Sequence, residues 1–355
     1  MEENRINILG VTLQALEGQM MALGQKAFRA KQIYSWLYKK RVFDFDEMTD
    51  ISVSFREVLK SKYYIHLPEV EVKKISSDGT MKLLVKLEDG QLVETVLMRY
   101  IYGDSVCVSS QVGCLMGCAF CASGLLRKRR DLTAAEMVGE FLVVDQILRT
   151  EIDTKAHLTH SVVMGTGEPF DNYDNVMDYV KIINCQFGID VGARHISIST
   201  CGIVPGIERF KDENLQINLA ISLHAPNDEI RNKLMPINRK YPLKELIKAI
   251  EDYNKSANGR RVTYEYIMID GLNNSLEHAK QLVELIKPTY GYVNLIPYNE
   301  VAEKPFKRSS NNKVHAFRDF LNANGIKATI RKEFGSDIDA ACGQLRAKYK
   351  KIKEE

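Results

Sequence analysis

Short apolar segments alternate with helical segments through residues 105–300, and this alternation constrains the fold more than any other feature of the sequence. Six segments rich in β-branched residues have the length of buried strands: 105–109, 160–165, 194–200, 217–223, 262–268 and 290–296. Between them lie helical patterns, such as 133–149 with a capping box of Thr133 and Glu136. Repeated strand–helix units predict a parallel sheet with right-handed crossovers. Because six units are too few for a closed eight-stranded barrel, an open, partial barrel or a doubly wound sheet remains.

The first 100 residues follow different patterns. Residues 12–65 are predicted to be helical, with Thr12 as the cap of a first helix. A second helix is expected to turn four side chains inward: Phe28, Ile33, Trp36 and Leu37. From 69 to 98 the apolar period becomes two, and the turn signals Asp78-Gly79 and Asp89-Gly90 separate three short strands. The predicted organisation is therefore a helical module (1–66), a β-meander (67–100), the strand–helix region (101–335) and a C-terminal segment (336–355).

Composition excludes several classes of protein. No run approaches the roughly 18 apolar residues of a membrane span, and the start of the chain lacks the basic-then-apolar pattern of a secretory signal, so we expect a soluble cytoplasmic protein. The net charge of +3 is too small to indicate nucleic-acid binding by itself. Seven cysteines without an export signal favour metal or redox chemistry over a disulfide framework.

Three of the cysteines form a compact motif. Cys114, Cys118 and Cys121 have the spacing Cys-x3-Cys-x2-Cys and follow the first strand of the alternating region. Three thiolates can bind three irons of a four-iron cluster and leave the fourth iron open to a substrate. The alternative is a zinc site, which needs a fourth Cys or His nearby. The nearest further cysteine, Cys107, lies on the preceding strand, so the spacing favours the open cluster.

Polar residues gather where the predicted strands end. The segments Gly165–Pro169, Ser199–Thr200, Ser222–His224 and Pro297–Asn299 each follow or close a strand. In βα barrels the chemistry lies at the carboxyl ends of the strands, so these segments and the cysteine loop predict one site. Taken singly, each segment has a simpler interpretation. Ser199 could cap its strand, His224 could be a hydrogen-bonded strand-end histidine, and the two glycines could form a turn.

These motifs resemble a known family. Cys-x3-Cys-x2-Cys is the cluster motif of the radical S-adenosylmethionine (SAM) superfamily. Cys107–Cys114, Asp337–Leu345 and the helical stretch Phe28–Trp36 are similar to its RlmN branch, over nearly the whole chain. The resemblance implies an α/β fold built on a partial (βα)6 barrel, a [4Fe-4S] cluster, and SAM as cofactor. It also implies methylation of C2 of an adenine in large-subunit (23S) rRNA and in tRNA next to the anticodon.

The resemblance also assigns the residues that bind SAM. Gly167 and Glu168 would hold its amino end, a role for which a carboxylate suits the cationic amine. The remaining SAM contacts of the family match Ser199, Ser222, Leu223, His224 and Asn299. The cluster ligands would be Cys114, Cys118 and Cys121.

Methylation at C2 requires further cysteines. Because this carbon is neither nucleophilic nor acidic, a carbon radical must add to it, and the methyl group has to be held on the protein first. A thiolate is the natural acceptor of a methyl cation. By resemblance Cys342 is the residue methylated, by one of two SAM molecules used per turnover, and Cys107 resolves the covalent RNA adduct with a transient Cys107–Cys342 disulfide. Glu94 matches the proposed proton acceptor; the sequence equally allows a solvent-facing strand residue, and either Glu94 or Cys107 could take the C2 proton.

Other assignments stay open at this level. Arg127–Arg130, directly after the cysteine loop, could neutralise RNA phosphates or be a solvated charge run. Cys185 and Cys201 have no role in this scheme and are expected to be small, partly buried side chains. Val112 favours the C2 enzyme over the related C8 adenine methyltransferase, which usually has a cysteine there. A non-catalytic, zinc-stabilised RNA-binding protein is the alternative of a different class. The expected partners are RNA and a flavodoxin or ferredoxin reductant, with the chain a monomer and no membrane.

Overall fold

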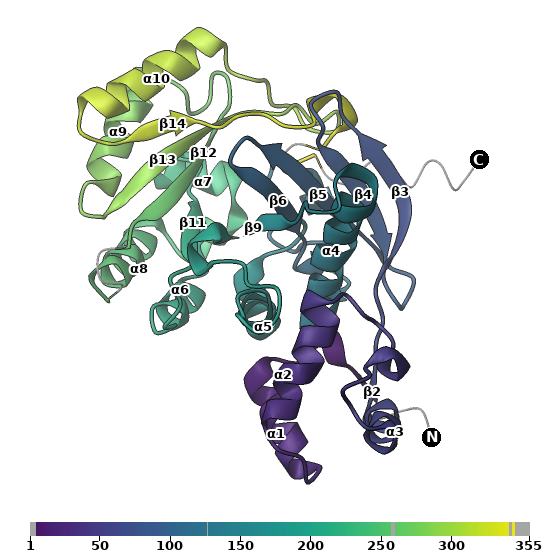
Figure 1. Ribbon diagram of the computed structural model, residues 1–355. Coiled ribbons are helices and arrows are strands. Elements are labelled where there is room, and N and C mark those ends of the chain that lie inside the picture. The colour runs from purple at the N-terminus through teal and green to yellow at the C-terminus, as the bar shows by residue number, and fades with distance from the viewer. Residues whose placement is uncertain (1–4, 126, 257–259, 341–342, 345–355) are drawn as a thin grey trace.

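A computed structural model describes residues 5–125, 127–256, 260–340 and 343–344. Within these residues the central sheet has ten strands in the order β14-β13-β12-β11-β10-β9-β6-β5-β4-β3 (Figure 1). The strands of this sheet are β3 (Glu69–Ile75), β4 (Met81–Lys86), β5 (Leu92–Tyr100), β6 (Gly103–Val108), β9 (Leu158–Val163), β10 (Ile196–Thr200), β11 (Asn218–Ser222), β12 (Val262–Met268), β13 (Gly291–Pro297) and β14 (Ala328–Ile330).

Strands β6 and β9–β14 pair in parallel, in the manner predicted for repeated strand–helix units. Helices cover the outer face of this part of the sheet, which curves into an open barrel (Figure 1). These helices are α4 (Ala134–Ile147), α5 (Tyr173–Ile183), α6 (Val204–Phe210), α7 (Asp228–Leu234), α8 (Leu243–Ser256), α9 (Leu276–Ile286) and α10 (Asn311–Ala323). The capping box predicted for Thr133 and Glu136 begins α4. The fold class is therefore confirmed: six strand–helix units form a partial barrel of the kind expected.

A seventh parallel strand, β14, was not predicted from the sequence. It follows α10 and pairs with β13, with Asn294 opposite Thr329. Three residues are too few for a period-two pattern to be recognised, and Lys327 and Arg331 flank them with charge. The strand forms because the edge of β13 supplies its hydrogen-bonding partners.

The predicted meander is present and belongs to the same sheet. Its three strands are separated by the two Asp-Gly turns, and β5 pairs antiparallel with β6, with Val96 opposite Cys107. After β14 the chain crosses the open side of the barrel and reaches the β3–β4 hairpin, where the amide of Gly335 donates to Asp78 Oδ2 at 3.0 Å. The hairpin and the C-terminal segment therefore lie against each other, although more than 250 residues separate them in sequence.

The N-terminal helices form a module beside α4 (Figure 1). They are α1 (Leu13–Ala22), α2 (Phe28–Tyr34) and α3 (Val53–Lys62), and two short strands, β1 (Ile6–Asn7) and β2 (Tyr63–Tyr64), pair in parallel. Thr12 Oγ1 accepts from the amide of Ala15, as predicted for a cap. An ion pair of 2.8 Å between Arg41 Nη2 and Asp145 Oδ2 joins the module to α4.

The prediction that Phe28 faces the core of this module is wrong. Ile33, Trp36 and Leu37 are buried, but Phe28 is 47% exposed. At about 100° per residue, the nine positions between Phe28 and Leu37 place them on opposite faces of the helical segment. None of the helices in the described ranges is long and apolar enough to cross a membrane.

Candidate functional site

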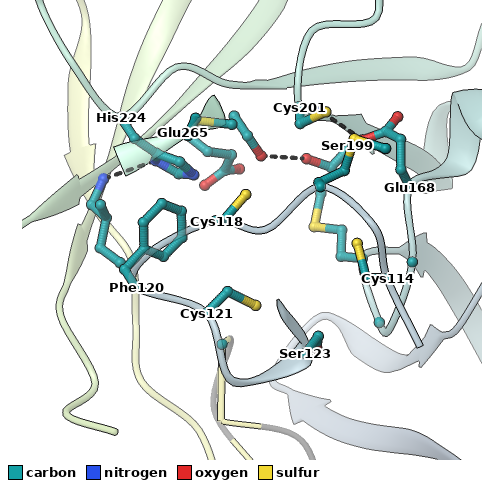
Figure 2. Close-up of a pocket in the computed structure, with 18 of the residues that line it drawn as sticks. Cys114, Cys118, Phe120, Cys121, Ser123, Glu168, Ser199, Cys201, His224 and Glu265 are labelled. Carbon is teal, nitrogen blue, oxygen red and sulfur yellow. Dashed lines mark hydrogen bonds between the residues drawn. The ribbon is translucent and has the colours of Figure 1, made fainter. Parts of the chain in front are cut away.

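A pocket opens at the carboxyl ends of the parallel strands (Figure 2). Residues from the loop after β6 and from each of the strands β9–β14, or the loops after them, line it. Eight of the predicted site residues are among them: Cys114, Cys118, Cys121, Gly167, Glu168, Ser199, Ser222 and His224. The prediction that these segments converge on one site is therefore confirmed in its geometry.

The cysteine loop forms one wall of this pocket. Cys114, Cys118 and Cys121 are half-buried free thiols that point into the same space (Figure 2). Burial raises the pKa of the Cys114 thiol to about 11, and burial also raises the pKa of Cys118. Both thiols are therefore protonated in the metal-free protein at neutral pH, and metal binding must release these protons.

The three thiols suit a metal cluster. They face one cavity from a single loop, and three thiolates can bind three irons of a four-iron cluster. The residues therefore suit a [4Fe-4S] cluster with one iron left open toward the rest of the pocket.

Glu168 is fixed opposite the cysteine loop. Its carboxylate is 3% exposed, with Oε1 accepting from the amide of Phe170 at 3.0 Å and Oε2 from the amide of Cys201 at 2.7 Å. Burial raises its pKa, so a cationic partner would favour its ionised form. Glu168 also lines the pocket, so its carboxylate is placed to attract an ammonium group bound there.

Gly167 is required next to this carboxylate. Its φ is +120°, and a Cβ there would lie 2.5 Å from Ser110 Oγ and 2.8 Å from the Gln111 nitrogen. Both neighbours belong to the segment after β6, so an added methyl group would push the two strand ends apart. Glycine therefore permits Glu168 to sit where two loops meet.

The variant Gly167→Ala is expected to weaken SAM binding by about 100-fold, the scale of loss when a binding group moves by about an ångström. Equilibrium binding of SAM to the cluster-loaded protein measures this. Gly192→Ala is the matched control, because Gly192 has φ −57° and its added Cβ would meet nothing closer than 4.0 Å. Unchanged affinity in Gly167→Ala, with the protein folded, would contradict the role given to this backbone.

His224 is both hydrogen-bonded and part of the pocket wall. Its Nδ1 accepts from the amide of Ile267 at 3.1 Å, so the proton of the neutral ring is on Nε2. Its backbone is left-handed, with φ +59°, and Phe120 packs edge-to-face on the ring with centroids 4.9 Å apart. Burial, followed by the charge of Arg231, lowers the pKa of His224 to about 3. The ring is therefore neutral at physiological pH.

This burial predicts an acid-sensitive contribution to stability. Below the ordinary histidine pKa of about 6.5, His224 is protonated in the unfolded chain but stays neutral in the folded chain. The free energy of unfolding therefore falls as the pH drops from about 6.5 toward 3. His224→Asn keeps an acceptor for Ile267 and tolerates the left-handed backbone, but does not titrate. Between pH 7 and pH 5 the wild type should lose about 2 kcal/mol more unfolding free energy than the variant, by urea titration. Equal losses would contradict a neutral, buried His224.

Two residues that form or support the site were not identified from the sequence. Glu265 on β12 lines the pocket, and its Oε2 accepts from Asn294 Nδ2 at 2.9 Å. The single charge in the apolar strand 262–268 was a signal that could have identified it. Arg231 on α7 is fully buried and donates to the carbonyls of Cys201 and Leu223, so it holds the ends of β10 and β11 together. Nothing in the pattern of α7 distinguishes this arginine from a surface residue.

Four predicted site residues in the described part of the chain do not line the main pocket: Leu223, Cys107, Asn299 and Glu94. The side chain of Leu223 packs in the core, so a contact with SAM could come only from its backbone. Cys107 and Asn299 line a second cavity, which shares Met164 with the first. The two cavities also share Ile296 and Arg331, so Cys107 lines a cavity next to the one that the cluster loop lines.

Glu94 is buried on β5, and the C-terminal segment reaches both cavities. Glu94 is 1% exposed and its Oε1 lies 3.4 Å from Lys82 Nζ, so the interpretation as a solvent-facing residue is wrong. Cys342 lies outside the described residues. Ala340 lines the second cavity, and Gly343 lines the main pocket, where its carbonyl accepts from the amide of Ala122 at 2.8 Å.

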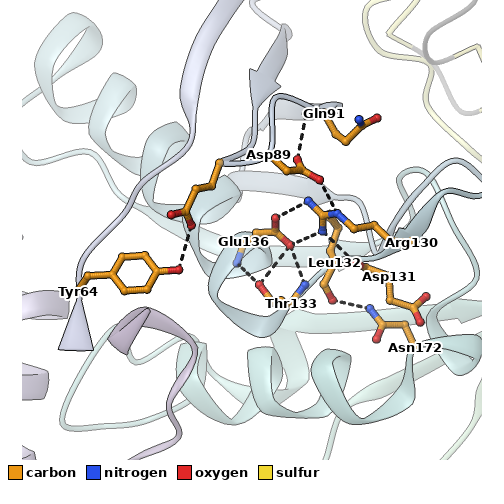
Figure 3. A network of polar contacts seen from close by, with 10 residues as sticks. Tyr64, Asp89, Gln91, Arg130, Asp131, Leu132, Thr133, Glu136 and Asn172 are labelled. Carbon is orange, nitrogen blue, oxygen red and sulfur yellow. Dashed lines mark hydrogen bonds and ion pairs between the residues drawn. The ribbon is translucent and has the colours of Figure 1, made fainter. Parts of the chain in front are cut away.

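The basic run after the cysteine loop is partly neutralised. Arg130 forms ion pairs with Glu136 at 2.7 Å and with Asp89 at 2.8 Å (Figure 3). Lys128 forms ion pairs with Asp131 and Asp171. The hypothesis of four cations available to RNA is therefore reduced to the exposed Arg127 and Arg129.

Two family models match the chain. The model for the radical SAM superfamily matches residues 108–286, which include most of the strands and loops of the pocket. The model described as the ribosomal RNA large subunit methyltransferase N-terminal domain matches residues 6–65, the helical module.

Known proteins match over nearly the full length. The chain is 49% identical over 346 residues to the "Probable dual-specificity RNA methyltransferase RlmN" of Thermoanaerobacter sp. (strain X514), covering 97% of this chain and 99% of that protein. It is 51% identical over 346 residues to the protein of the same name from Caldanaerobacter subterraneus subsp. tengcongensis, with the same coverage. A solved structure of a radical SAM methyltransferase from Sphaerobacter thermophilus has a TM-score of 0.89 and 43% identity, covering 96% of this chain and 99% of that chain.

Proposed function

The chain belongs to the RlmN family of radical SAM RNA methyltransferases, and on that premise we propose that it methylates C2 of an adenine in 23S rRNA and in tRNA next to the anticodon. The methyl group passes through S-methylcysteine at Cys342, and each turnover uses two SAM molecules. The bound cluster supplies a low-potential electron that converts SAM into a hydrogen-abstracting 5′-deoxyadenosyl radical.

Residues of the chain itself carry out the remaining steps. The thiolate of Cys342 accepts a methyl cation from the first SAM, which leaves as S-adenosylhomocysteine. Cys114, Cys118 and Cys121 would hold the cluster, and Gly167 and Glu168 would hold the amino end of SAM. The Cys342 methyl group then gives a hydrogen atom to the 5′-deoxyadenosyl radical, and its carbon adds to adenine C2. The adduct loses the C2 proton to Glu94 or Cys107 and one unpaired electron, which the cluster would take back. The Cys107 thiolate attacks the Cys342 sulfur, which breaks the bond from that sulfur to the product carbon and leaves a disulfide, and the released carbon takes up a proton to become the methyl group.

One observation carries this proposal. The carbonyl of Gly343, the residue after Cys342, accepts a hydrogen bond from Ala122, the residue after the last cysteine of the cluster motif. One hydrogen bond therefore joins two residues that are more than 200 positions apart in the sequence. Ala340, two residues before Cys342 in the sequence, lines the cavity that Cys107 also lines. This supports the same relay, because Cys107 and a near neighbour of Cys342 then lie at one cavity.

Product analysis tests the proposal. The anaerobically purified protein should be brown, carry about four irons per chain, and convert 23S rRNA and tRNA fragments to a product that contains 2-methyladenosine on digestion. A product methylated at C8 would assign the related C8 activity instead. A colourless protein that binds zinc and leaves RNA unmodified would contradict catalysis altogether.

The proposal includes partners and location. The substrates are RNA, and a flavodoxin or ferredoxin provides the electron. The target base has to leave its stack to reach the pocket, as in other base-modifying enzymes. We place the protein in the cytoplasm as a monomer, with the helical module and the exposed cations Arg127 and Arg129 contacting RNA.

A further inference from the structure

The β3–β4 hairpin makes a set of contacts with the chain just before Cys342. The carboxylate of Asp337 accepts from the Ser76 hydroxyl and, at 3.1 Å, from the amide of Ser77. In return, Asp78 Oδ2 accepts from the amide of Gly335 at 3.0 Å. Two carboxylates, one from each segment, thus bind the opposite segment reciprocally. Such paired charge-assisted hydrogen bonds fix both position and orientation.

The turn at Gly335 fits closely against the hairpin. Its φ is +61°, and a Cβ there would lie 2.6 Å from Ala340 Cβ and 2.9 Å from Thr80 Cγ2. The amide of Ala340 donates to the Gly335 carbonyl at 3.0 Å, so residues 335–340 form a compact loop. A side chain at position 335 would therefore push this loop away from Thr80.

Lys82 connects this loop to Glu94. It is 3% exposed on β4, and its Nζ lies 3.4 Å from Glu94 Oε1 on β5 and donates to the Asp339 carbonyl at 3.0 Å. Burying an ammonium group is costly unless charged and polar partners surround it. The structure places these partners on two different segments: the strand that carries Glu94, and the loop that leads to Cys342.

We propose that the β3–β4 hairpin is the docking site of the segment that carries the methyl-accepting cysteine, and that Lys82 is the positioning residue joining this segment to Glu94. This rests on the RNA methylation proposed above. The segment is held at one end by the hairpin and at the other by Ala122, which binds Gly343. The described residues on both sides of Cys342 are therefore held, Gly335–Ala340 by the hairpin and Gly343 by the loop after the cluster motif. Lys82 lines neither of these two cavities, so it acts through the segment that it holds.

Lys82→Met tests the proposal on the full chain with its cluster. Hydrogen–deuterium exchange of the peptide covering residues 334–345 is expected to rise about 10-fold, while iron content and SAM affinity stay unchanged. The rate constant kcat for RNA methylation should fall about 100-fold with KM for RNA unchanged, because the geometry of the relay and the surroundings of Glu94 are altered while the RNA-contacting surface is not. Lys82→Arg, which keeps the cation, should recover most of both losses. The matched control is Lys86→Met, from the same strand but 43% exposed and paired with Glu69 and Glu71.

A second variant covers the case in which Lys82→Met does not fold because Glu94 is left charged and buried. Lys82→Met/Glu94→Gln removes both buried charges, and it also removes the hydrogen bond from Lys82 to the Asp339 carbonyl. Hydrogen–deuterium exchange of this variant can be measured whatever the catalytic role of Glu94. Increased exchange confined to residues 334–345 supports docking through Lys82; unchanged exchange overturns it, whatever happens to activity. If exchange differs between the variant and the wild type as expected, but the wild type does not methylate RNA, the proposed function fails and the docking stands.

Discussion

Replacing Cys342 by alanine is expected to abolish RNA methylation, with a loss of at least about 10⁴-fold, the scale seen when a covalent nucleophile is removed. The reason is that, in the proposed relay, Cys342 carries the methyl carbon before it reaches C2. The cluster ligands and the SAM pocket come from the barrel strands and their loops, so iron content and SAM binding should remain. Transfer of labelled methyl from SAM to an RNA fragment measures the loss.

The control for this variant is Cys185→Ala. Cys185 is a half-buried free cysteine that lines neither cavity, so its removal should leave methylation at the wild-type rate. Cys342→Ser adds a second check, because a serine hydroxyl is a far weaker acceptor of a methyl cation than a thiolate. Methylation by either Cys342 variant above the background without enzyme would exclude the relay.

Replacing Cys107 by alanine is expected to give a different failure. Cys342 would still be methylated and its carbon would still add to adenine, but no thiol would remain to attack the Cys342 sulfur. A covalent protein–RNA adduct should therefore accumulate, at a stoichiometry approaching one RNA per chain. A band of slow mobility on a denaturing gel, removed by both protease and nuclease, measures the adduct.

The burial of Cys107 makes this variant interpretable. Its side chain is 7% exposed in a small apolar cluster with Val96, Met98 and Phe334. The change to alanine removes a single sulfur from this cluster, which costs far less stability than the loss of a large core side chain. Free, fully methylated RNA from Cys107→Ala would show that another group resolves the adduct.

Features of the site that are local in sequence could be predicted. The cysteine spacing, the glycine before Glu168 and the polar residues at the strand ends each lie within a few positions of a recognisable strand or turn. Parallel strands bring their carboxyl ends to one edge, so the convergence of these segments followed from the alternation alone. For this reason eight of the predicted residues line one pocket.

Features that depend on long-range contacts could not be predicted. Arg231 and Lys82 are charged side chains whose buried environment comes from segments distant in sequence, and their own neighbours resemble surface patterns. The burial of Glu94 has the same origin, since strand periodicity alone did not indicate which face of β5 the C-terminal segment covers. The exposure of Phe28 was predictable in principle, from the helical angle that separates it from Leu37.

The most direct test of the whole account is the mass of the peptide that contains Cys342, measured on protein produced in cells and purified without oxygen. We expect a fraction of this peptide to carry one added methyl group on the cysteine, and to carry a deuterated methyl group when the cells are fed deuterated methionine. The same peptide from Gly167→Ala, in which SAM is bound weakly, should carry less. If the cysteine stays unmodified in protein that is loaded with iron and active on RNA, the methyl group reaches adenine by another route and the relay through Cys342 is wrong.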